Sequence, residues 1–135
     1  MTEEENARIV RETTETVVNE HNPNAIDEYF TEDATIEGAG STLSREEFKE
    51  FTRGVFHAFP DVTFTYDELF AKGDMVAFRW IVEGTHEGEF QGIEATGNEF
   101  SYPAVGIAKI EDGKIAELKY ESDRVSLMEQ LGATP

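Results

Sequence analysis

The chain has 135 residues, no cysteine and a formal net charge of −18, with 29 acidic residues against 11 basic ones. Its length suits one domain over residues 1–135, and 39% hydrophobic residues are enough for a packed core. The negative charge argues against nucleic acid and anionic lipid as partners, because both would repel the chain. The lack of cysteine excludes disulfides, thiolate metal sites and a cysteine nucleophile.

Acidic residues are spread along the whole chain rather than gathered in one tail. Such a surface is typical of proteins that work in concentrated salt, where the Debye length falls to about 3 Å at 1 M and self-repulsion is screened. We therefore expect a salt-adapted source, although an ordinary acidic protein can have a similar composition. No apolar run could cross a membrane, and the acidic start Met1–Asn6 is unlike a signal peptide, so we expect a cytoplasmic protein.

The first part of the chain has helical periodicity. Apolar residues fall on one side of the segment from Thr2 to about Glu20, and His21-Asn22-Pro23-Asn24 ends this helix. A short second helix is expected over Ala25–Phe30, followed by a short strand over Ala34–Glu37.

A capping box predicts the start of a third helix. The Ser44 hydroxyl can accept a helical N–H while the Glu47 side chain reaches back to Ser44, and Pro60 ends the run. Aromatic residues follow the box at helical spacing, and we expect them to form the core between helix and sheet: Phe48, Phe51, Phe56 and Phe59. On this helix His57 is expected at the surface, as is His21 in the earlier helix stop.

From Asp61 onward the periodicity changes to two, which is typical of half-buried strands. Turns are expected at Gly73-Asp74 and at Glu111-Asp112-Gly113-Lys114. A last helix covers Arg124–Leu131 and ends at Gly132. The predicted strands cover residues 62–67, 76–82, 100–110 and 115–122.

This order of elements predicts an α+β fold. Helices would cover the concave face of a curved antiparallel sheet with strands of mixed length, and the resulting cone offers a pocket between the sheet and the first helices.

Several segments together resemble a known family: Phe59–Val62, Gly73–Trp80, Gly84–Phe90, Gly92–Gly97, Ile110–Ile115, Asp123-Arg124 and Glu129–Gly132. They are similar to the SnoaL-like polyketide cyclases of the NTF2-like superfamily, and the resemblance extends from Ala7 to Gly132. It implies the NTF2-like cone as the fold. Relatives with this signature include cyclases, isomerases, hydrolases and proteins without an established reaction.

The resemblance also implies a chemistry without metal or organic cofactor. SnoaL-like cyclases close a ring by an intramolecular aldol reaction, in which a carboxylate takes a proton from a carbon flanked by carbonyls. The family's acid/base aspartate lies just before the final helix, and the matching residue here is Asp123. No histidine on the strand Val105–Ile110 matches the family's pocket histidine.

Two candidate catalytic residues each have a structural alternative. One interpretation makes Asp123 an acid/base at the pocket end of the last strand. The other makes it the N-cap of the final helix, facing away from the core. His86 continues the inner-facing alternation of Trp80 and lies at the pocket mouth, or it is a partly exposed histidine in a hairpin.

The candidate substrate-binding residues are aromatic: Trp80, Phe90, Tyr102 and Tyr120. The tyrosine hydroxyls can polarise a substrate carbonyl or satisfy a backbone group, whereas Trp80 also suits the core. Three scattered histidines without ligand spacing argue against a metal site.

Three functions remain open from the sequence. The chain is a cofactor-free cyclase, isomerase or hydrolase acting on a hydrophobic carbonyl compound, a ligand-binding or accessory domain without chemistry, or an interaction protein with a packed cone. In each case we expect a homodimer through the outer sheet face, where Thr63, Arg79, Ile81 and Lys109 form a mixed surface.

Overall fold

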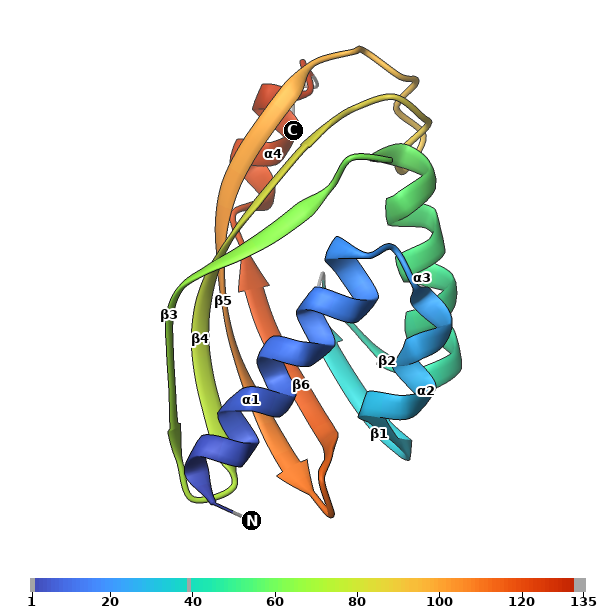
Figure 1. Cartoon of the computed structure of the whole chain (residues 1–135). Helices are drawn as coiled ribbons and strands as arrows, with labels where there is room; N and C mark the ends of the chain where they lie inside the picture. Colours follow the sequence, from blue (N-terminus) through green and yellow to red (C-terminus); the bar gives the residue numbers. More distant parts are fainter. Residues whose placement is uncertain (1, 39, 133–135) are drawn as a thin grey trace.

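The computed structural model describes residues 2–38 and 40–132, which form a curved mixed sheet with helices on its concave face (Figure 1). The sheet of the described residues has six strands in the order β2-β1-β6-β5-β4-β3. The strands are β1 (Phe30–Gly38), β2 (Ser41–Ser44), β3 (Thr63–Lys72), β4 (Met75–Thr85), β5 (Glu99–Glu111) and β6 (Lys114–Ser122).

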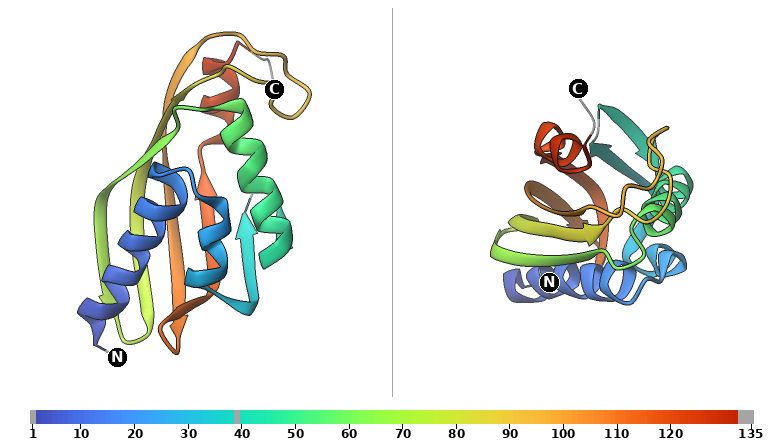
Figure 2. Two further views of the ribbon diagram at one scale, coloured as in Figure 1. Left: turned by 45° about the vertical axis from the view of Figure 1, so that its right-hand side comes forward. Right: turned by 90° about the horizontal axis from the view of Figure 1, so that it is seen from above.

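The helices cover three parts of the sheet. Helix α1 packs on β3, β4 and β6, α3 packs on β1 and β2, and α4 packs on β5. Viewed from above, α1 and α3 lie along two different parts of the curved sheet (Figure 2). No helix of the described residues is long and apolar enough to cross a membrane. The helical segments are α1 (Glu3–Thr13), a π-helical turn (Thr14–Asn19), a 3-10 turn (Pro23–Ala25), α2 (Ile26–Tyr29), α3 (Arg45–Ala58) and α4 (Arg124–Gln130).

Local sequence signals explain where the two long helices begin. The predicted capping box of α3 is present, with the Glu47 N–H donating to Ser44 Oγ at 3.2 Å and the Ser44 N–H donating to Glu47 Oε1 at 3.0 Å. Thr2 and Glu5 form the same arrangement before α1. Each box satisfies backbone donors that the first helical turn would otherwise leave unpaired.

The end of the first helical segment differs from a regular α-helix. Over Thr14–Asn19 the backbone widens into a π-helical turn, and the Glu20 N–H donates to the Glu15 carbonyl five residues earlier at 3.0 Å. The Thr14 hydroxyl is hydrogen-bonded to the Tyr66 hydroxyl of β3 at this point. The apolar periodicity of the segment gave no sign of this widening.

The sheet is not wholly antiparallel, which corrects the sequence prediction. Strand β1 is longer than the predicted Ala34–Glu37 and begins at Phe30, where the predicted second helix had been extended. It pairs parallel with β6, and its other edge is occupied by the short β2, which the sequence did not predict. The remaining neighbours pair antiparallel as expected.

The predicted inner face of the sheet is confirmed. Val76, Phe78, Trp80 and Val82 are all less than 9% exposed, whereas the residues between them are more accessible. Strand β5 pairs with β4 so that Ala104 lies opposite Trp80, and its alternate residues Phe100, Ala104 and Ala108 are buried. The apolar side chains of α1 and α3 complete this core.

Candidate functional site

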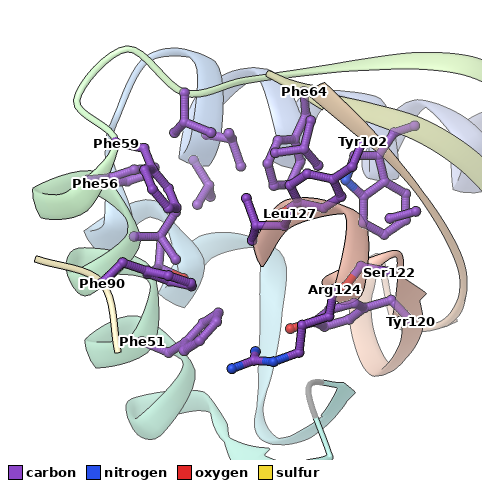
Figure 3. A pocket seen from close by; sticks show the side chains of 18 of the residues that line it. Phe51, Phe56, Phe59, Phe64, Phe90, Tyr102, Tyr120, Ser122, Arg124 and Leu127 are labelled. Carbon is purple, nitrogen blue, oxygen red and sulfur yellow. The ribbon is translucent and has the colours of Figure 1, made fainter. Parts of the chain in front are cut away.

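A cavity of about 150 Å³ lies between α3, the π-helical turn and the inner face of the sheet. Its walls are largely apolar, and the phenylalanines of α3 lie opposite the residues of β5, β6 and α4 (Figure 3). Four of the wall residues are those that the sequence assigned to substrate binding: Trp80, Phe90, Tyr102 and Tyr120. The phenylalanines assigned to the core also line it: Phe48, Phe51, Phe56 and Phe59.

The π-helical turn contributes two consecutive residues to the wall. Val17 and Val18 both line the cavity. Adjacent residues on an α-helix point about 100° apart, so the widened turn helps both side chains reach the same hollow. A smaller cavity of about 70 Å³ lies beyond the larger one and shares Val17, Val18 and Trp80 with it.

The polar groups of the cavity are neutral or cationic. Arg124, Gln91 and Ser122 line the cavity together with the two tyrosines, and no aspartate or glutamate of the described residues lines it. Burial raises the pKa of Tyr102 to about 12, and burial also raises the pKa of Tyr120. Both hydroxyls are therefore protonated at neutral pH and available as hydrogen-bond donors.

A long loop between β4 and β5 closes one end of the cavity. Residues 86–98 arch past the end of α3 (Figure 1), where the Glu87 and Gly88 N–H groups donate to the Ala58 carbonyl at 2.9 and 3.0 Å. A side chain at Gly88 would place its Cβ 2.4 Å from the His57 carbonyl oxygen. Only glycine lets the loop approach the helix this closely.

The tip of this loop is a tight turn that presents Gln91 to Arg124. Phe90 and Ile93 exchange two backbone hydrogen bonds of 2.9 Å, and the residues between them, Gln91 and Gly92, have φ values of 49° and 84°. Positive φ at both central positions is the geometry of a type I′ turn. In this turn the Gln91 side-chain oxygen Oε1 accepts a hydrogen bond from the Arg124 guanidinium.

His86 lies inside the protein rather than at the pocket mouth. It points inward as predicted and is fully buried, so it is not the partly exposed histidine of the alternative prediction. Its Nδ1 accepts a hydrogen bond from the Thr96 N–H at 3.3 Å and lies 3.0 Å from the Thr96 hydroxyl, while the ring packs edge-on against Phe59. Because a backbone N–H can only donate, the neutral ring carries its proton on Nε2. His86 is not among the residues that line the cavity.

Asp123 is exposed and caps α4. Its Oδ1 accepts a hydrogen bond from the Ser126 N–H at 3.0 Å, which is the N-cap arrangement that the sequence left as an alternative. It stands between Ser122 and Arg124, which both line the cavity, but it does not line the cavity itself. An acid/base role for Asp123 remains a prediction.

Arg124 is the site residue that sequence reasoning missed. The sequence analysis treated it only as the start of the last helix. The alternation along β6 carried the available signal, because an inner-facing Ser122 makes residue 124 the next position on the same side.

The sequence predicted that both remaining histidines lie at the surface. His57 is exposed as predicted. His21 is instead half-buried and stacks on Phe56 with ring centroids 4.6 Å apart.

The described residues contain no group of three histidine, aspartate or glutamate side chains arranged to hold a metal ion.

Comparisons with solved structures find close matches over nearly the whole chain. AclR, described as a "putative hydroxylase" from Streptomyces galilaeus, is 26% identical with a TM-score of 0.90, and the match covers 99% of this chain and 100% of that one. IdmH, a "putative polyketide cyclase" from Streptomyces antibioticus, is 28% identical with a TM-score of 0.84, covering 95% and 99% of the two chains.

A more distant structure supports the fold alone. A protein with a ketosteroid isomerase-like fold from Catenulispora acidiphila is 20% identical with a TM-score of 0.80, and the match covers 93% of this chain and 92% of that one. The predicted NTF2-like architecture is thereby confirmed. No curated protein sequence matches the chain significantly.

The sequence model of one family matches residues 8–131, which is nearly all of the described chain. The match includes every residue that lines the cavity. The chain therefore belongs to the SnoaL-like polyketide cyclase family.

Proposed function

We propose that the protein binds a small hydrophobic carbonyl compound in the cavity and promotes its cyclisation or isomerisation without a cofactor. The observation that carries this proposal is an apolar cavity lined by Tyr102 and Tyr120, whose hydroxyls make no hydrogen bond to any described residue. Each hydroxyl is therefore free to donate a hydrogen bond to a ligand carbonyl that enters the cavity.

The size of the cavity limits the part of a ligand that it encloses. Ligand pockets for drug-sized molecules span about 300–1,000 Å³, whereas an engineered apolar cavity of about 150 Å³ in another protein holds one benzene ring. A cavity of 150 Å³ therefore suits one ring of a ligand, and a larger molecule would extend through the mouth past Gln91 and Arg124.

The proposed reaction needs only proton transfer and positioning. A base removes a proton from a carbon flanked by two carbonyls, and the enolate carbon then attacks a further carbonyl carbon of the same molecule. The new carbon–carbon bond leaves an alkoxide, which takes a proton back. Tyr102 and Tyr120 would donate hydrogen bonds to the enolate oxygen, where negative charge develops before ring closure.

Asp123 is the proposed base because it follows the last strand directly beside the cavity mouth. In the observed arrangement its Oδ1 is engaged by the Ser126 N–H, so the carboxylate would have to turn toward the mouth when a substrate is bound. In a protein that binds a ligand without catalysing a reaction, Asp123 would serve only as the N-cap of α4. The second candidate function, a ligand-binding domain of the same fold, is favoured by the absence of a carboxylate among the described wall residues.

Asp123→Asn separates the two functions. Asparagine caps a helix about as well as aspartate, so the fold is expected to persist, but the amide cannot accept a proton. Turnover of a small panel of 1,3-dicarbonyl compounds should fall by about 100-fold or more in D123N, the usual range for loss of a general base. Glu121→Gln, which removes an exposed carboxylate on the same strand, is the matched control and should keep full activity.

The fluorescence of Trp80, the single tryptophan, reports binding independently of turnover. If the panel binds and none of it reacts with either protein, the chain is a binding domain. If no member of the panel changes the fluorescence, the proposed cavity function is wrong.

We also propose that two copies associate through the outer face of the sheet. Phe70, Val105 and Ile107 are between 46% and 64% exposed there, and Phe70 of β3 and Ile107 of β5 lie on either side of Ala77 of β4. This face also carries four of the chain's 11 basic residues, interleaved with glutamates: Lys72, Arg79, Lys109 and Lys119. In a chain of net charge −18, these basic residues lower the repulsion that a second copy would meet at this face.

Ile107→Asp is expected to give a single-chain mass by size-exclusion chromatography with light scattering, while the native protein gives twice that mass. Val125→Asp is the matched control, because Val125 is 55% exposed on α4, away from the sheet face. A native protein of single-chain mass would overturn the dimer.

A further inference from the structure

Arg124 is one of two arginines, with Arg11, that have no carboxylate partner among the described residues, and it alone of the six lines the cavity. Its guanidinium donates to the Gln91 side-chain oxygen, and no carboxylate of the described residues lies within ion-pair distance. Four other arginines do have carboxylate partners: Arg8, Arg45, Arg53 and Arg79. With 29 acidic residues available, an arginine held by an amide at a cavity mouth calls for a separate explanation.

The stability of α4 does not explain the position of Arg124. It is the first residue of that helix, where the helix dipole favours negative rather than positive charge. The cation also lies at an exposed position rather than packed in the core. Its place is better explained by what it faces, which is the mouth of the cavity.

Tyr102, Tyr120 and Trp80 add further hydrogen-bond donors to the cavity wall. Arg124 is close enough to Tyr102 to favour the charged form of that phenol, and Tyr102 is close enough to Tyr120 for their charges to interact. Burial nevertheless raises the pKa of Tyr102 to about 12, so the proton stays on its oxygen at neutral pH. In the same wall, the indole N–H of Trp80 is buried and has no acceptor among the described residues.

These donors favour a ligand that supplies hydrogen-bond acceptors. The apolar walls would hold a hydrocarbon body, while a guanidinium and two phenol hydroxyls that line the same cavity are available to donate to the ligand's oxygen atoms. A neutral carbonyl would use these donors only in part. A negatively charged oxygen would gain from all of them, because hydrogen bonds to an ionised acceptor are about twice as strong as those between neutral groups.

We propose that the cavity preferentially binds a small aromatic or conjugated molecule carrying one negatively charged oxygen, as phenolate, enolate or carboxylate, and that Arg124 selects this charge. The inference rests on the proposed function and narrows its ligand class. For an enolisable ligand, Arg124 would favour the enolate over the neutral ketone and so lower the pKa of the bound carbon acid.

The test compares three one-ring probes by quenching of Trp80 fluorescence. Benzoate carries the oxyanion and benzyl alcohol is its neutral counterpart of similar size. 4-Nitrophenol ionises near neutral pH and shows by its absorption spectrum which form is bound. We expect benzoate to bind about tenfold or more tightly than benzyl alcohol, and bound 4-nitrophenol to be the phenolate at a pH where the free probe is mostly neutral.

Variants assign the preference to one residue. Arg124→Gln should lose about tenfold in benzoate affinity and leave benzyl alcohol unchanged, while Arg124→Lys should keep part of the preference. Arg8→Gln removes an exposed arginine of α1 that does not line the cavity and is the control, which should behave like the native protein. Circular dichroism checks that each variant is folded.

The outcomes separate this inference from the proposed function. Equal binding of benzoate and benzyl alcohol, with both quenching Trp80, would overturn the charge preference and leave the cavity function standing. A preference for benzoate that persists in R124Q would also overturn the assignment to Arg124. Failure of all three probes to bind would overturn both proposals.

Discussion

Filling the cavity from its sheet wall should stabilise the protein and abolish binding. Ala104 is 3% exposed on β5, lies opposite Trp80 and lines the cavity. Ala104→Leu adds three carbon atoms to the hollow. Each buried methylene contributes about 0.8 kcal/mol, and ordering a leucine side chain costs roughly 0.5–1 kcal/mol, so the free energy of unfolding should rise by about 1.5 kcal/mol.

The matched control is a buried alanine away from the cavity. Ala34 is 2% exposed on β1 and is not among the cavity-lining residues. The same Ala→Leu change there has to push packed neighbours apart, which destabilises by about 1–3 kcal/mol. The two variants therefore differ in sign, although both place a leucine on a buried strand.

Urea unfolding followed by Trp80 fluorescence measures both variants. The midpoint should rise for A104L and fall for A34L at an unchanged dependence on urea concentration. A104L should also lose the fluorescence response to benzoate. If A104L destabilises the protein as much as A34L, the space next to Ala104 is not an empty cavity and the binding-site interpretation is wrong.

Three further predictions concern stability. The melting temperature should rise with added KCl, because salt screens the repulsion within a chain of net charge −18; a melting temperature indifferent to KCl would refute salt adaptation. Hydrogen bonds from Lys49 hold the pKa of Asp27 below its ordinary 3.8, so its stabilisation is present above that pH and is lost as the pH falls through the lowered value. Asp27→Asn should thus be less stable than the native protein at pH 7 and approach the native stability in acid. Urea unfolding midpoints measured across this pH range test the prediction. A difference in midpoint that stays constant with pH would contradict it. Ser44→Ala should lose about 1 kcal/mol in urea unfolding by removing the cap of α3, whereas Ser44→Asp should lose much less.

The element types and the inner face of the sheet could be predicted from the sequence because they depend on short-range rules. The Ser44–Glu47 box, the turn after Lys72 and the alternation from Val76 to Val82 each act over a few residues. Extending that alternation also placed His86 and Phe90 on the inner side correctly. The aromatic wall of the cavity followed from the same periodicity.

Contacts between distant segments decided the rest. The parallel pairing of β1 with β6, the hydrogen bond between Thr14 and Tyr66 and the burial of His86 against Phe59 all join residues far apart in sequence. No local pattern fixes such pairings, because the gain comes only when the whole sheet has formed.

The charge of the site was likewise settled by tertiary structure. The sequence offered Asp123 and Arg124 as neighbours at the end of β6, with no local means of choosing between them. In the folded chain the start of α4 needs a cap, which turns Asp123 toward the Ser126 N–H and leaves Arg124 on the side of Ser122 and the cavity. Because Asp123 is used to cap α4, the charged residue that lines this edge of the cavity is Arg124. The edge is therefore basic, rather than acidic as had been expected from Asp123.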